Sequence, residues 1–165
     1  MNKIYVVGAI DEDSFKQFSE ELTAIERKSN PENRFVEIEM NSGGGSAMDA
    51  LAFYSRIINS PCSINVTSYG LVASAAVLVF AACDHRRMTK DSWMMVHEDS
   101  DALKDKSTSD FEKHAAYMRR MEDQWNTLLE KETGTLKSVW LDLHKKTTYL
   151  IAEECVKLGI VDEVI

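Results

Sequence analysis

Short apolar runs alternate with amphipathic stretches over the N-terminal part of the chain. The apolar runs predict short strands at about 3–7, 35–40, 63–68, 87–88 and 93–96. Apolar residues spaced three and four apart predict the helices between them, at about 12–28, 48–58 and 73–82. Turns are expected at Gly8, Pro31, Pro61 and Gly70. Because strands alternate with helices, the pattern predicts an α/β fold with a largely parallel sheet covered by helices.

The C-terminal part of the chain has a different pattern, dominated by one long amphipathic stretch. After a polar loop at 98–109, apolar residues recur on one stripe of a helix over about 110–132. At 1.5 Å per residue this helix is roughly 30–35 Å long, so we expect it to reach toward another subunit. Two shorter helices, at about 136–145 and 152–158, follow. We expect the whole chain, 1–165, to form a single domain.

Composition narrows the class of protein further. The chain has 165 residues, of which 44% are hydrophobic and 28% charged, as in globular proteins. Its net charge of −8 disfavours binding to nucleic acid or to an anionic membrane. The longest apolar run, 71–83, is too short to span a bilayer. Cys62, Cys83 and Cys155 form no CxxC pair, so we expect buried thiols in a reducing, cytoplasmic compartment, and no metal or cofactor.

A glycine-rich turn at 41–46 is the first candidate for chemistry, because it lies between a predicted strand and a predicted helix. Glycines there allow backbone N–H groups to approach a ligand closely. The phosphate-binding patterns GxxxxGK[ST] and GxGxxG are both absent. A plain tight turn, a phosphate site and an oxyanion hole made of N–H groups therefore all remain open.

Ser74 and His97 are the second and third candidates. Ser74 lies in another strand-to-helix turn among alanines, where a serine is often only a helix cap, but small neighbours also leave room for a substrate carbonyl. His97 ends a predicted strand, where a histidine is often only structural. A nucleophile, a base and a backbone donor are what acyl transfer requires, and the two turns and the strand end can converge at one sheet edge. The other histidines, His85, His114 and His144, are expected at the surface.

Four segments, in order and with matching spacing, resemble motifs of the proteolytic subunit of the Clp protease, a serine peptidase that forms stacked rings. The family's Asn-Ser-Pro-Gly-Gly reads 41–45 here, its Gly-x-Ala-Ala-Ser reads 70–74, and its Val-Met-Ile-His reads 94–97. Its fourth motif is a C-terminal run of aromatic-Leu-x-Ala-x-Glu followed by x-Gly-Leu-Val-Asp, and it reads 149–154 and 158–162 here. The resemblance covers residues 3–165, and the four motifs together are far more specific than any one of them.

The resemblance implies a crotonase-like ββα superhelix, in which the helix near 110–132 is a protruding handle between two stacked heptameric rings. It implies a serine endopeptidase that cleaves unfolded polypeptides inside a ring-shaped chamber, without a cofactor. Ser74 would form the acyl-enzyme, His97 would be the general base, and the N–H groups of Gly45 and Ala75 would form the oxyanion hole. The implied partners are further copies of the chain, unfolded peptides and an ATP-driven unfoldase.

This sequence departs from the family's pattern at three places. The triad aspartate, two residues before the aromatic Tyr149, is replaced by Thr147, which can hold an imidazole but supplies no negative charge. Loss of that aspartate in other serine proteases costs roughly 10⁴-fold in turnover. The chain begins almost at the first strand, which argues against the family's docking to an unfoldase, and 98–104 lacks the family's glycine. These departures fit a short, divergent member of the family, phage-encoded or accessory.

Two alternatives to an active peptidase therefore remain. One is a weakly active or inactive accessory subunit that assembles with a complete Clp-type protease. This alternative arises because Thr147 stands where the family has its triad aspartate. The other is a crotonase-type acyl-CoA enzyme, which would share the fold and the oxyanion hole. The pairing of Ser74 with His97 and the acidic charge of the chain disfavour that second alternative.

Overall fold

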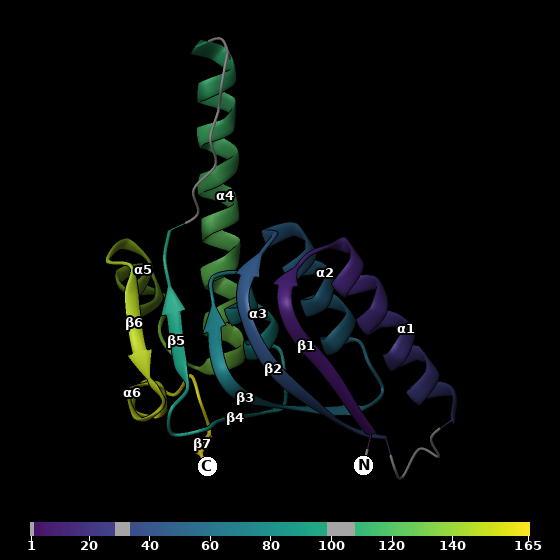
Figure 1. Ribbon diagram of the computed structural model, residues 1–165. Coiled ribbons are helices and arrows are strands. Elements are labelled where there is room, and N and C mark those ends of the chain that lie inside the picture. The colour runs from purple at the N-terminus through teal and green to yellow at the C-terminus, as the bar shows by residue number, and fades with distance from the viewer. Residues whose placement is uncertain (1, 29–33, 99–107) are drawn as a thin grey trace.

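The computed structural model describes residues 2–28, 34–98 and 108–165 (Figure 1). The strands are β1 (Asn2–Ile10), β2 (Phe35–Gly45), β3 (Ser63–Ala73), β4 (His85–Met88), β5 (Trp93–Val96), β6 (Thr148–Ile151) and β7 (Glu163–Val164). The helices are α1 (Glu12–Lys28), α2 (Ala47–Ile58), α3 (Ala76–Ala81), α4 (Thr108–Thr133), α5 (Lys137–Lys145) and α6 (Ala152–Lys157). Apart from Glu98, the stretch 98–104 lies outside the described residues, so the expectation about its missing glycine is not addressed.

The strands form one seven-stranded sheet, and its order follows the alternation of strands and helices along the chain. The main path is β1-β2-β3-β4-β7, and every pairing on it is parallel. β5 pairs in parallel with the end of β3, and β6 pairs antiparallel with β5. The predicted α/β fold with a largely parallel sheet is therefore confirmed.

One face of the sheet carries the hydrophobic core, because side chains of a strand alternate between its two faces. In β1, Ile4 and Val6 are buried, whereas Tyr5 between them is exposed. α1 and α2 meet on the covered face through Phe18 and Phe53, whose ring centroids lie 4.9 Å apart. Every residue of α3 is buried, because this short apolar helix packs between the sheet and the neighbouring helices α2 and α4.

β3 differs from its predicted extent in a way that matters for the site. The sequence places a turn at Gly70, but the strand continues through it as far as Ala73. The backbone N–H of Leu71 donates to Oδ1 of Asn41 at 3.0 Å, and Val72 pairs with Ser42 on β2. A Cβ at position 70 would lie 2.8 Å from that Asn41 oxygen, so glycine serves here for a close approach rather than for a turn. The turn itself falls at Ser74.

α4 stands out from the rest of the fold, and its N-terminal half projects well beyond the sheet and the other helices (Figure 1). Its buried residues, Asn126 and Leu129, both lie in its C-terminal half. Phe111 and Tyr117, nearer the tip, leave close to half of their surface exposed. Among the residues that the structure describes, no helix is both long and apolar enough to cross a membrane.

The last residues of the chain return to the sheet through an ion pair between a buried arginine and a partly exposed aspartate. The guanidinium of Arg86 on β4 donates to both carboxylate oxygens of Asp162, at 2.9 and 3.0 Å. The backbone N–H of Arg86 donates to the same carboxylate at 2.8 Å. Arg86 is buried, and its Nη1 also donates to the carbonyl oxygen of Glu132 at the end of α4. This pair therefore joins the C-terminal segment, the sheet and the base of α4.

Candidate active site

Ser74 lies in a sharp turn between β3 and α3. Its backbone φ is +53°, in the left-handed region that residues other than glycine rarely adopt. The turn is held on both sides, because the N–H of Ser74 donates to the carbonyl of Met95 on β5 at 2.9 Å and its own carbonyl accepts from Val77 at 3.0 Å. Strained backbone of this kind persists where its surroundings fix it, and such residues cluster at functional sites. Ser74 remains half-buried, so its hydroxyl is not sealed in the core.

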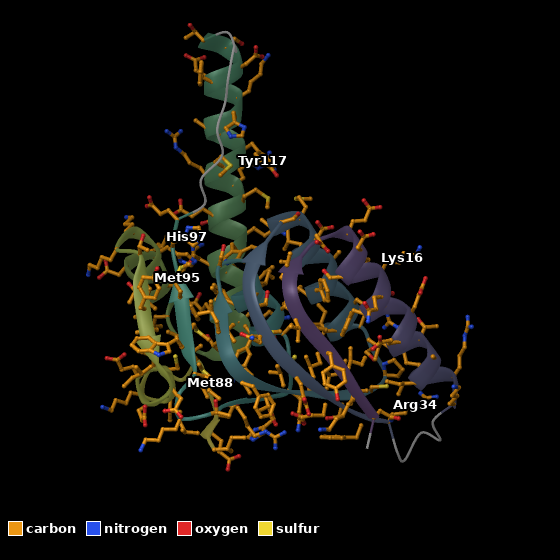
Figure 2. All side chains as sticks on the ribbon, in the orientation of Figure 1. Lys16, Arg34, Met88, Met95, His97 and Tyr117 are labelled. Atoms are coloured by element: carbon orange, nitrogen blue, oxygen red, sulfur yellow. The ribbon has the colours of Figure 1, made fainter. Side chains whose placement is uncertain are left out.

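His97 follows β5 directly and reaches the same turn. Its Nε2 lies 2.8 Å from Oγ of Ser74, which is hydrogen-bond distance. Figure 2 shows His97 just beyond the end of β5, near the part of α4 that joins the rest of the fold. The two residues that the sequence singles out, 23 positions apart, are therefore brought together in the geometry of a nucleophile and its base.

The glycine-rich turn at 41–46 packs against the serine turn. A Cβ at Gly44 would lie 2.6 Å from the carbonyl oxygen of Ala73 and 2.7 Å from Cβ of Ser74. The φ of Gly44 is +90°, so this position needs glycine for its conformation as well as for the space. The N–H of Gly44 donates to Oγ of the buried Ser42 at 3.1 Å, and that hydroxyl donates to the carbonyl of Gly8 at 2.7 Å. The close approach fixes the two turns relative to one another.

A cavity of about 280 Å³ opens over these two turns. Gly45, Ser74, Ala75 and His97 lie in its wall, so all the sequence-predicted site residues except Thr147 meet in one place. The opposite wall comes from α4, which contributes Met118, Met121 and Trp125 together with the polar residues Arg119, Glu122 and Asn126. Ser74 and His97 thus lie on one side of the cavity, and a mixed apolar and polar surface of α4 faces them from the other side. Among the described residues, no group of histidine, cysteine and acidic side chains is arranged to hold a metal ion.

Thr147 is not part of the cavity wall. It is exposed in the turn between α5 and β6, with a φ of +47°, and its N–H donates to the carbonyl of His144 at 3.2 Å. Within the described part of the chain, neither its side chain nor a carboxylate is hydrogen-bonded to His97. The structure therefore does not bring this third predicted residue to Ser74 and His97.

His144 is the site residue that the sequence reasoning missed. It is half-buried and lines the cavity, although the sequence predicts it at the surface. Its ring packs beside Trp140, one helical turn earlier, which is fully buried. That i, i+4 pairing of a tryptophan with a histidine was the available signal, because residues four apart on a helix share a face.

The comparisons with known proteins agree with this geometry. The family model described as Clp protease matches residues 1–165, the whole chain. Among solved structures, a point mutant of ClpP1 from Listeria monocytogenes superimposes with a TM-score of 0.89 at 23% sequence identity, over 99% of this chain and 91% of that one. The expected crotonase-like fold is thereby confirmed. The chain belongs to the Clp protease family.

Proposed function

We propose that this protein is a serine endopeptidase that cleaves unfolded polypeptides through an acyl-enzyme on Ser74. The observation that carries the proposal is the 2.8 Å separation of Ser74 Oγ and His97 Nε2 at the foot of a cavity. The left-handed turn presents the hydroxyl to that cavity, and alanines on both sides of Ser74 leave it accessible. Membership of the Clp protease family supports the same reaction class.

The geometry indicates the order of the chemical steps. Oγ of Ser74 attacks the substrate carbonyl carbon while Nε2 of His97 takes the hydroxyl proton. The N–H groups of Gly45 and Ala75, both at the cavity, stabilise the negative oxygen that forms. The protonated His97 then gives its proton to the amide nitrogen as the C–N bond breaks, which leaves an ester on Ser74. Water, deprotonated by His97, hydrolyses the ester, releases a carboxylic acid and restores the serine.

The surfaces of the protein support assembly of several copies into rings around a chamber. Aromatic side chains are more than 45% exposed on the sheet face opposite the helices or along α4: Tyr5, Tyr69, Trp93, Tyr149, Phe111 and Tyr117. Exposed apolar surface of this extent marks protein interfaces more often than monomer surface. We propose that these regions bury one another in rings stacked through α4, and that substrate enters as an unfolded chain.

Labelling with a fluorophosphonate probe, followed by mass spectrometry of the modified peptide, tests the proposal. We expect modification at Ser74 that is lost in Ser74→Ala and reduced at least about 100-fold in His97→Ala, because the base accelerates the attack. His85→Ala is the matched control, because His85 lies on β4, outside the cavity wall. In this variant Ser74 should be labelled at the parental rate. An assembled parent protein that does not label at Ser74 would contradict the proposal.

A second function is favoured by one observation, the position of Thr147 outside the cavity. A base without a charged partner is a weaker base, so the chain could serve chiefly as an accessory subunit of a complete Clp-type protease. Native mass spectrometry of the two proteins after co-expression tests this directly. Mixed rings in which only the partner's serine is labelled would support it, whereas separate rings would contradict it.

A further inference from the structure

The wall of the cavity that faces Ser74 combines apolar and acidic side chains. Four residues of α4, spaced three and four apart and therefore on one face of the helix, line the cavity together: Met118, Met121, Glu122 and Trp125. The two methionines and the tryptophan are half-buried, whereas the glutamate is exposed. A carboxylate thus stands among apolar side chains on the wall that a substrate bound at Ser74 must face.

The charges of the cavity wall are unequal in number. Glu98, which follows His97 directly, is a second exposed carboxylate in the wall, and Arg119 supplies one guanidinium. Within the described part of the chain, no ion pair engages the side chains of Glu98, Arg119 or Glu122. Both carboxylates are therefore available to a cation that enters the cavity.

Asn126 adds a buried acceptor to the same wall. It is 1% exposed and lines the cavity one helical turn after Glu122. Its Nδ2 donates to the backbone carbonyl of Glu122 at 2.8 Å, but its Oδ1 has no hydrogen-bond partner among the described residues. A buried acceptor without a partner costs free energy, so such groups are rare in native proteins. A hydrogen-bond donor on the substrate would complete this one.

A long basic side chain matches all of these features. Its methylene groups pack on methionine and tryptophan, and its cationic head carries several N–H donors. An apolar side chain would take water from the carboxylates without replacing its hydrogen bonds, and an acidic one would be repelled by them. We propose that the cavity binds lysine or arginine as the residue whose carbonyl Ser74 attacks, and that Glu122 determines this preference. This inference rests on the proposed peptidase function.

Several groups share in the recognition of the cationic head. Glu122 accepts from it at the exposed side of the wall, Oδ1 of Asn126 accepts at the buried side, and the ring of Trp125 attracts it. Arg119 opposes binding, because its guanidinium repels the head. The net charge of −8 favours the approach of cationic peptides to the protein. Since ion pairs at exposed carboxylates are weak, the preference is moderate rather than absolute.

Acyl-peptide coumarin amides that differ only in the residue before the scissile bond test this preference. They are assayed at pH 8 with the full-length, assembled protein. Norleucine is the neutral match for lysine, because it has the same four-carbon chain without the ammonium group. We expect kcat/KM for lysine to exceed that for norleucine about 5- to 20-fold, with glutamate below both. The ratio of lysine to norleucine should fall in 1 M NaCl, because salt screens exposed charges.

Variants of the wall assign the preference to particular residues. Glu122→Gln keeps the size of the side chain and should lower the ratio of lysine to norleucine about two- to fivefold, and Glu122→Lys should place glutamate above lysine. Asn126→Leu, which removes the buried acceptor, should also lower the ratio, whereas Arg119→Gln should raise it. Glu20→Gln is the matched control, since it removes one negative charge from an exposed position of α1 outside the cavity wall, and it should keep the parental ratio.

The contrary results are distinct from a failure of the proposed function. A parent protein that is labelled at Ser74 but cleaves the norleucine substrate as fast as the lysine substrate overturns the inference and leaves the peptidase proposal intact. A parental ratio in Glu122→Gln overturns the role of Glu122. An equal fall of the ratio in Glu20→Gln shows an effect of overall charge and overturns that role too. If the parent is not labelled at Ser74, the proposed function fails and this inference fails with it.

Discussion

The contact of Gly44 with the serine turn leads to a sharp prediction for Gly44→Ala. The new Cβ would lie 2.6 Å from the carbonyl oxygen of Ala73, 2.7 Å from Cβ of Ser74 and 2.9 Å from the backbone nitrogen of Ala75. All three are backbone or near-backbone atoms of the turn that carries Ser74, and none lies at the far end of a flexible side chain. The turn must therefore move as a unit.

The magnitude of the effect follows from two costs. A left-handed conformation costs a residue with a Cβ about 1–2 kcal/mol, and overpacking a closed site costs about 1–3 kcal/mol more. We therefore expect Gly44→Ala to lower the free energy of unfolding by about 2–5 kcal/mol. The activity should fall further, because a displacement of about 1 Å at the reacting atoms costs on the order of 100-fold in rate.

Urea unfolding and the rate of fluorophosphonate labelling at Ser74 measure these two effects. Gly43→Ala is the control in the same loop, since a Cβ at Gly43 would meet no atom within 4 Å. This variant should match the parent in both measurements. Gly44→Ala with parental stability and a parental labelling rate would refute the argument that the two turns are in close contact.

Three other features give predictions that separate measurements check. Burial raises the pKa of Asp162, but its hydrogen bonds to Arg86 outweigh burial and hold that pKa below its usual value of about 4. The pair therefore stabilises the fold above about pH 4, and this stability is lost as the pH falls through the folded-state pKa. Because Asp162 is partly exposed and water screens the pair, Asp162→Asn should lower the free energy of unfolding by about 1–2 kcal/mol at pH 7 and by less at pH 3. The same loss at both pH values in urea unfolding would contradict this. Burial raises the pKa of the Cys155 thiol to about 12, so iodoacetamide at pH 8 should modify this thiol only after the protein unfolds. Rapid modification of the native protein, detected by mass spectrometry, would contradict the burial of Cys155. Thr147→Asn should raise the free energy of unfolding by about 0.5–1 kcal/mol, because asparagine tolerates the φ of +47° better than a β-branched residue does. A lower free energy of unfolding in urea than that of the parent would count against this.

The fold could be predicted from the sequence where local pattern and tertiary structure agree. The periodicity of residues 12–28 gives α1 with its observed bounds, because the apolar stripe of this helix faces the sheet. β3 was predicted too short, since its continuation through Gly70 depends on the side chain of Asn41 in the neighbouring strand. β6 was not predicted at all, because four residues that pair only with β5 have no periodicity of their own.

The candidate site could be predicted only in part, for a similar reason. Ser74 and His97 stand in recognisable turns at the ends of strands, so the sequence points to them. His144 belongs to a short helix whose orientation depends on how Trp140 packs, and that packing is decided by residues far away in the sequence. The wall formed by Met118 and Trp125 likewise depends on tertiary structure, because it requires α4 to pack against α3 and α5.

α4 has two ends in different surroundings. Trp125 and Asn126 in its C-terminal half line the cavity over Ser74, whereas Phe111 lies near the exposed tip. A continuous helix of 26 residues is stiff over its length of about 39 Å, because each residue adds 1.5 Å and every turn is hydrogen-bonded to the next. A tilt imposed on the tip must therefore displace the cavity wall as well. The shape of the cavity is therefore linked, through this stiff helix, to any contact made at the tip of α4.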